Sequence, residues 1–159
     1  MATELSPSAR KVQDALERFE LKCEVIELPA SARTAKEAAA AVGCQVEQIV
    51  KSLVFRGAQT KRPVMVVASG PNRVNEQKIG ELFQEPIEKA DADFVREKTG
   101  FAIGGVPPVG HATKIEIFVD EDLLKYEEIW AAAGTPNAVF KLTPSDLMKI
   151  TEGKVVSVK

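Results

Sequence analysis

A single lysine lies among large apolar residues in the segment 49–55, and its position calls for a chemical explanation. Side chains alternate along a β-strand, so Lys51 shares one face of this predicted strand with every second residue. Those residues are Ile49, Leu53 and Phe55. Burying a lysine costs free energy unless the ammonium is paired or reaches water. Two interpretations are open: the ammonium extends past the strand end into solvent, or it lies at the mouth of a pocket and binds a carbonyl oxygen, a phosphate or a developing oxyanion.

A second segment that suggests chemistry is the loop 100–111, with four glycines and two prolines in twelve residues. This composition ends helices and interrupts β-ladders. Gly104 and Gly105 allow the backbone to approach a ligand and to turn its N–H groups toward it. The loop lacks the glycine spacing of nucleotide-binding sites. It is either a rigid turn between a helix and a strand, or, beside a cation, an oxyanion site.

The other reactive side chains are few, which excludes whole classes of mechanism. His111 is the only histidine, and Cys23 and Cys44 are the only thiols. A histidine-rich zinc site and a four-cysteine metal cage are excluded, and we expect no metal and no cofactor. A Ser-His-Asp triad would have to use His111, which is otherwise a general base, a substrate contact or a surface residue. Both cysteines suit packing better than nucleophilic catalysis.

Length and charge bound the class of protein. The chain has 159 residues, of which 45% are hydrophobic and 28% charged, a composition typical of a soluble globular protein. We expect one domain over residues 1–159. The 21 basic and 23 acidic side chains give a net charge of −2, so any contact with nucleic acid needs a local patch. The candidate residues, which form either a modest phosphate-binding patch or a solvated face, are Arg33, Lys36, Arg56, Lys61 and Arg62.

The compartment is predicted from what the sequence lacks. No apolar signal segment opens the chain, and the longest apolar run is about five residues, far below the roughly 20 that span a bilayer. Two thiols without an evident disulfide pattern fit a reducing compartment. We therefore expect a cytoplasmic protein without a membrane contact.

Short helices and strands must position these residues. Capping and periodicity predict a helix that begins at Ser6-Pro7 and further helices over 35–42, 76–83, 92–98 and 145–150. Apolar runs predict strands over 25–28, 49–55, 64–68, 115–119, 128–132, 138–142 and 155–158. The second and third strands form a central hairpin, apolar on both faces. Because helices and strands do not alternate regularly, we expect an α+β fold. It would be a single compact domain with a mixed six- to seven-stranded sheet or a partly closed barrel, surrounded by short helices.

Together these motifs resemble the YbaK family of free-standing aminoacyl-tRNA deacylases, whose fold is also that of the editing domain inserted in bacterial prolyl-tRNA synthetases. Three stretches carry the resemblance, which covers nearly the whole chain. Residues 46–55 place Lys51 at the family's active-site lysine. Residues 100–110 match the family's GxxxGGxxPxG loop. The turn Gly134-Thr135-Pro136 precedes a strand and a final helix.

The resemblance implies hydrolysis of the ester that joins a wrong amino acid to the terminal ribose of tRNA. The expected substrate is tRNA-Pro carrying a small amino acid such as alanine or cysteine, bound by its acceptor end and edited in trans. Prolyl-tRNA synthetase is a candidate partner, and the chain would act as a monomer or weak dimer. Lys51 and the N–H groups of Gly104 and Gly105 would stabilise the oxyanion. The expected substrate-binding residues are Leu53, Ile103, Val106, Pro108, Gly110, His111 and Gly134.

Two other functions stay open from the sequence. One is a non-catalytic module that binds aminoacyl-tRNA or its synthetase, and retained binding without hydrolysis would support it. The other is a small amino-acid esterase that uses the same oxyanion site. Such an esterase would cleave free amino-acid esters as well as tRNA esters.

Overall fold

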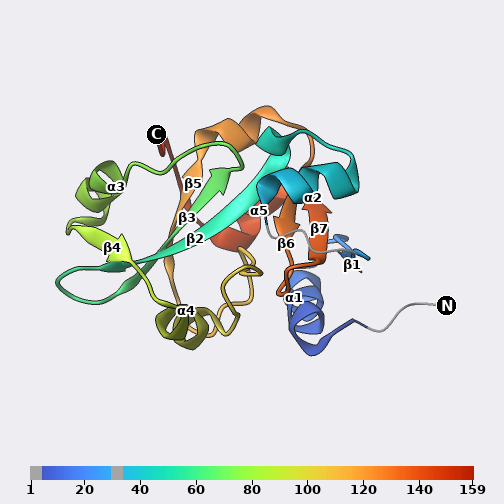
Figure 1. The fold of residues 1–159 in the computed structure, drawn as a ribbon, viewed down its shortest axis with the longest axis horizontal. Coiled ribbons are helices and arrows are strands. Elements are labelled where there is room, and N and C mark those ends of the chain that lie inside the picture. Colours follow the sequence, from blue (N-terminus) through green and yellow to red (C-terminus); the bar gives the residue numbers. More distant parts are fainter. Residues whose placement is uncertain (1–4, 30–33) are drawn as a thin grey trace.

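In the part of the chain that the structure describes, eight strands form one mixed sheet, and five short α-helices pack around it (Figure 1). The computed structural model describes residues 5–29 and 34–159. The strands are β1 Val25–Glu27, β2 Ile49–Gly57, β3 Pro63–Ser69, β4 Ile87–Lys89, β5 Glu116–Asp120, β6 Ile129–Ala132, β7 Ala138–Leu142 and β8 Lys154–Val156. The helices are α1 Pro7–Arg18, α2 Ala35–Val42, α3 Glu76–Phe83, α4 Ala92–Thr99 and α5 Pro144–Thr151. Two short 3₁₀ turns are η1 Val46–Gln48 and η2 Glu121–Lys125.

The five predicted helices are confirmed, and so are their caps. The Ser6 side chain accepts from the Ala9 N–H, and Thr34 and Glu37 form the expected capping box. No described helix has both the length and the apolar character needed to cross a membrane. The α+β prediction is therefore confirmed, with one strand more than expected. The extra strand is β4, which contains one apolar residue, Ile87, and therefore shows no apolar run in the sequence.

The sheet is ordered β1-β7-β6-β2-β3-β5-β8, and β4 pairs with β2 outside this path. Three neighbouring pairs are parallel, β2 with β6, β3 with β5 and β5 with β8, and the rest are antiparallel. Among the described residues no pairing joins β1 to β8, so the sheet is open. The mixed pairing agrees with the irregular order of helices and strands in the sequence.

The pairing of β2 leaves a gap on one of its edges. Toward β3 the strand is paired antiparallel over residues 50–56, as the predicted hairpin requires. On the other edge β6 pairs only with Ile49 and Val50, and β4 pairs only with residues 55–57. Residues 51–54 therefore have no strand partner on that edge in the described part of the chain.

Burial on both faces fixes the central hairpin. Along β3, Met65 and Val67 belong to the core cluster that contains Leu16 and Phe140. Their neighbours Val64, Val66 and Ala68 belong to a second cluster on the opposite face. Residues 64–68 are completely buried, so β3 holds the paired edge of β2 rigidly in place.

Candidate functional site

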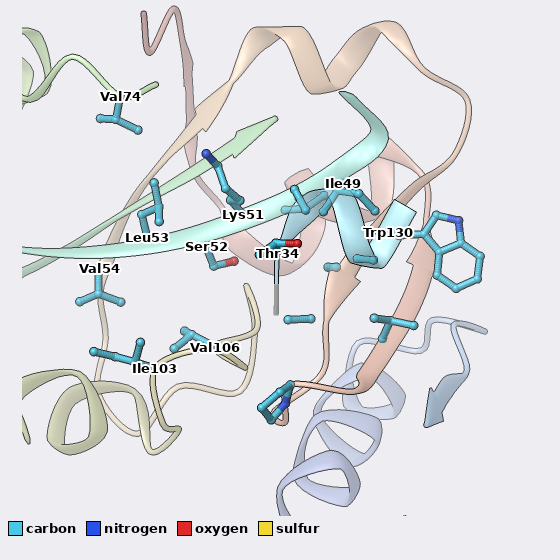
Figure 2. A pocket seen from close by; sticks show the side chains of 18 of the residues that line it. Thr34, Ile49, Lys51, Ser52, Leu53, Val54, Val74, Ile103, Val106 and Trp130 are labelled. Atoms are coloured by element: carbon cyan, nitrogen blue, oxygen red, sulfur yellow. The ribbon is translucent and has the colours of Figure 1, made fainter. Parts of the chain in front are cut away.

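A cavity of about 980 Å³ lies at the open edge of β2 (Figure 2). Its walls come from β2, α2, the turn that follows β3, the glycine-rich loop and the end of β6. The gap between β6 and β4 thus exposes a stretch of strand backbone inside a cavity. Main-chain groups without a strand partner are available there to a bound ligand.

Lys51 lines this cavity from β2. Its ammonium donates a hydrogen bond to the main-chain oxygen of Asn72 at 3.1 Å. Partial burial lowers the pKa of Lys51, and the negative charge of Asp120 opposes that shift. The structure therefore agrees with the pocket interpretation of this lysine: the cation lies in a cavity wall.

The partner of Lys51 is held by a buried carboxylate that sequence reasoning missed. Asp120 is fully buried at the end of β5. One of its oxygens accepts from the side-chain amide of Asn72 at 2.7 Å and from the N–H of Ser69 at 3.0 Å. Its other oxygen accepts from the N–H of Asp122 at 2.9 Å. An acidic residue at the end of an apolar strand was the signal available in the sequence.

Ser52 lies on the other face of β2, beside the glycine-rich loop. Figure 2 shows its side chain directed to the side of the strand where Ile103 and Val106 lie, whereas Lys51 extends from the opposite side. The Ser52 Oγ is buried and has no hydrogen-bond partner among the described residues. A buried hydroxyl without a partner is costly, so a polar group of a ligand in the cavity would satisfy it.

The glycine-rich loop contributes Ile103, Gly104 and Val106 to the cavity. Gly104 has a φ of 100°, and a Cβ at this position would meet nothing within 4 Å. Its N–H has no protein acceptor within the described residues. The N–H of Gly105, by contrast, donates to the oxygen of Ala102 at 3.2 Å. Of the two glycines, Gly104 is therefore the one whose N–H is a candidate donor to an oxyanion.

Gly105 and Gly134 hold two turns together outside the cavity. The N–H of Gly134 donates to the oxygen of Gly105 at 2.8 Å. A Cβ on Gly105 would lie 2.7 Å from the Cα of Thr135, and one on Gly134 would lie 2.7 Å from the oxygen of Ser8. This close approach explains why glycine occupies both positions.

Four predicted substrate-binding residues remain, and only some of them line the cavity. Leu53 lines the cavity, whereas Pro108, Gly110 and His111 do not. The His111 ring donates from Nε2 to the oxygen of Pro107 at 2.7 Å, and burial lowers its pKa, which keeps the ring neutral near pH 7.

Most of the predicted basic patch is neutralised. Arg56 and Lys61 both pair with Glu88, at 3.0 and 2.9 Å, and Arg62 pairs with Glu85. Lys36 is exposed, and Arg33 lies outside the described residues.

Two other cations, Arg73 and Lys89, line the cavity and have no carboxylate within ion-pair distance in the described part of the chain. Within residues 5–29 and 34–159 no group of three metal-binding side chains is found.

The chain is similar in sequence and fold to known proteins. A family model described as an aminoacyl-tRNA editing domain matches residues 29–150. A solved structure, "a putative trans-editing enzyme for prolyl tRNA synthetase", is 54% identical, with a TM-score of 0.93 and coverage of 98% of this chain and 99% of that one.

Among curated relatives, "Uncharacterized protein YwhH" of Bacillus subtilis is 30% identical over 148 residues, 93% of this chain and 94% of that protein. The proline–tRNA ligase of Bacillus licheniformis is 38% identical over 112 residues, 69% of this chain but only 19% of the ligase. The chain is thus similar to a whole small protein and to one part of a much larger ligase.

Proposed function

The chain belongs to the aminoacyl-tRNA editing domain family, and on that premise we propose that it hydrolyses the ester of misacylated tRNA in the cavity at the open edge of β2. The substrate is tRNA-Pro carrying a small wrong amino acid such as alanine or cysteine, and the chain acts in trans. The observation that carries this proposal is the position of Lys51. Its partly desolvated ammonium lines a cavity on whose other side Gly104 has an unused N–H.

The proposed reaction is attack of water on the ester carbonyl. A substrate bound over the open β2 edge lies between the Lys51 ammonium and the Gly104 N–H, and both stabilise the oxyanion. Collapse of the intermediate breaks the bond between the carbonyl carbon and the ribose oxygen. Of the two protons of the attacking water, one passes to the ribose oxygen and the other is released to solvent, so the amino acid leaves as a carboxylate. Water is positioned by main-chain groups and by the neighbouring ribose hydroxyl, since His111 lies outside the cavity.

Selectivity for small amino acids follows from apolar walls. Leu53, Ile103 and Val106 line the cavity, and a well-packed wall rejects side chains that are too large. It discriminates weakly against side chains that are too small, because one missing methylene is worth only about 1–3 kcal/mol. The proposed pocket is therefore a sieve with an upper size limit.

Prolyl-tRNA synthetase is the proposed partner. The net charge of −2 gives the chain little general attraction to tRNA. A corresponding segment forms 19% of the Bacillus licheniformis ligase, where it is joined covalently to the rest of the enzyme. Recruitment by a synthetase would supply the selectivity that charge alone does not.

A deacylation panel tests the proposal. It contains tRNA-Pro charged with alanine, cysteine, serine, 2-aminobutyrate or proline, non-proline tRNAs charged with alanine, and alanine ethyl ester. Each is incubated with and without prolyl-tRNA synthetase. We expect rapid hydrolysis of the small wrong amino acids on tRNA-Pro and none of the prolyl ester. Equal cleavage of the ethyl ester would identify a general esterase, and binding without hydrolysis would identify a non-catalytic module.

A further inference from the structure

We propose that Asp120 is a positioning residue for Lys51, acting through Asn72. This inference rests on the proposed function, because it assigns Lys51 to the reacting ester. Asp120 itself does not line the cavity. Its effect would reach the cavity through the turn 69–72, which follows β3.

The contacts form a continuous chain from the carboxylate to the ammonium. Asp120 accepts from the Asn72 side-chain amide at 2.7 Å, and the Asn72 main-chain oxygen accepts from Lys51 at 3.1 Å. The N–H of Asn72 donates back to the oxygen of Ser69 at 2.9 Å, and the N–H of Ser69 binds the same carboxylate. Both ends of the turn are therefore fixed by one buried group.

The turn has little freedom to move in other directions. The Ser69 hydroxyl donates to the oxygen of Glu47 at 2.6 Å. A Cβ on Gly70 would lie 2.4 Å from the oxygen of Val46, so this part of the backbone is packed directly against η1. The acceptor of Lys51 is thus held at a defined position, and the long lysine side chain loses much of its freedom.

Asp120 also differs from its neighbour Asp122 in its ion pairs. The Asn72 amide contacts Asp122 as well, at 2.8 Å, but Asp122 is paired with Lys125 at 2.9 Å and Lys159 at 3.1 Å. Asp120 has no ion pair in the described part of the chain. Its negative charge therefore remains uncompensated and favours the protonated form of Lys51.

Other charged groups lie around Lys51, so a titration of Lys51 has to be interpreted together with their charges. The charged residues that line the same cavity or belong to this network are Arg73, Glu76, Lys89, Asp120, Asp122, Lys125 and Lys159. Of these, Asp120 is the one that contributes to the shift in the pKa of Lys51.

The test compares Asp120→Asn and Asn72→Ala with the wild type and with Glu85→Gln. Glu85 is a matched control, because it is also a buried carboxylate that binds main-chain N–H groups but lies outside the cavity. Folding of each variant is checked by circular dichroism and thermal unfolding. The readouts are kcat for alanyl-tRNA-Pro and an NMR titration of the Lys51 side chain in ¹³C-lysine protein, assigned with Lys51→Arg.

We expect Asp120→Asn to lower kcat at least tenfold, in line with the cost of a misplaced reacting group, and to lower the pKa of Lys51. Asn72→Ala keeps the buried charge, so it lowers kcat while changing the Lys51 titration less. Glu85→Gln leaves kcat and the Lys51 titration unchanged, although it lowers stability. If Asp120→Asn does not fold, Asn72→Ala decides the positioning role through kcat.

Folded Asp120→Asn and Asn72→Ala proteins that keep wild-type kcat and an unchanged Lys51 titration would overturn the inference. Lys51→Ala separates this failure from failure of the proposed function. If Lys51→Ala is inactive while both network variants are fully active, only the positioning role is wrong. If Lys51→Ala is fully active, the proposed role of the lysine is wrong as well.

Discussion

Replacing Lys51 with methionine removes the cation while keeping an unbranched side chain of similar length. Lys51 is half-buried in the cavity wall, and its ammonium has one hydrogen bond to protein, to the oxygen of Asn72. The methionine side chain can occupy the same wall without the ammonium's desolvation cost. The substitution therefore tests the charge rather than the packing.

Two free-energy terms set the expected size of the effect. Loss of one hydrogen bond from a charged donor costs about 1.5–3 kcal/mol of stability, and the relieved desolvation of the ammonium offsets much of it. The free energy of unfolding should thus change by no more than about 1 kcal/mol. Removal of one oxyanion donor lowers the rate by about 10²- to 10³-fold, or about 2.7–4 kcal/mol in the barrier. Activity should fall far more than stability.

Single-turnover deacylation of alanyl-tRNA-Pro, with thermal unfolding in the same buffer, measures both quantities. Lys61→Met is the matched control, since Lys61 lies at the β2–β3 hairpin and pairs with Glu88 outside the cavity. It should deacylate at the wild-type rate. A folded Lys51→Met protein whose rate lies within threefold of Lys61→Met would refute the electrostatic role of Lys51.

Three further predictions concern the loop, the cavity rim and the hairpin. Gly105→Ala and Gly134→Ala should each lower the free energy of unfolding by several kcal/mol, because their Cβ atoms would lie 2.7 Å from backbone atoms. Gly104→Ala should lose only about 1 kcal/mol for its positive φ, because its Cβ meets open space, and urea unfolding measures all three variants. The double variant Arg73→Glu, Lys89→Glu should deacylate tRNA more slowly and with a weaker salt dependence, while its hydrolysis of alanine ethyl ester is unchanged. An equal loss of rate on both substrates would argue against contacts between these residues and phosphate. Hydrogen bonds from Thr60 and Gln59 and from Arg62 lower the pKa of Glu85 from 4.5 to about 2, so the stability that Glu85 contributes is complete above pH 4.5 and is lost as pH falls toward 2. Acid unfolding of Glu85→Gln should lack this loss of stability, and acid unfolding curves identical to those of the wild type would contradict the prediction.

Local signals predicted the parts of this protein that depend on neighbours in sequence. Helix caps such as Thr34 with Glu37 and the strand around Lys51 are readable over a few residues, and the structure has both. The glycines of the loop 100–111 predicted a backbone that approaches a ligand, and this stays a prediction. The structure shows a close approach of Gly105 to the backbone of Thr135, and Gly104 lines the cavity.

Contacts between distant segments were beyond sequence reasoning. The bond between Asn72 and Asp120 joins residues 48 positions apart, and neither residue carries a local pattern that names its partner. The gap on β2 depends on where its pairing with two other strands stops. Pairing with β6 stops at Val50 of β2, and pairing with β4 begins at Phe55 of β2. Because β4 contains one apolar residue, Ile87, it shows no apolar run, and the strand that bounds the gap could not be predicted.

The gap offers an explanation of how a chain with so few reactive side chains would carry out the proposed ester hydrolysis. A fully paired β2 would use its main-chain groups within the sheet, and residues 51–54 would have only side chains to offer. Because β6 and β4 stop on either side, this stretch lies inside a cavity with Lys51 on one face and the unpartnered Ser52 hydroxyl on the other. An ester placed over that edge meets a cation, a hydroxyl and main-chain groups that the fold already holds in position. Strand pairing, more than the choice of side chains, thus determines where the proposed reaction takes place.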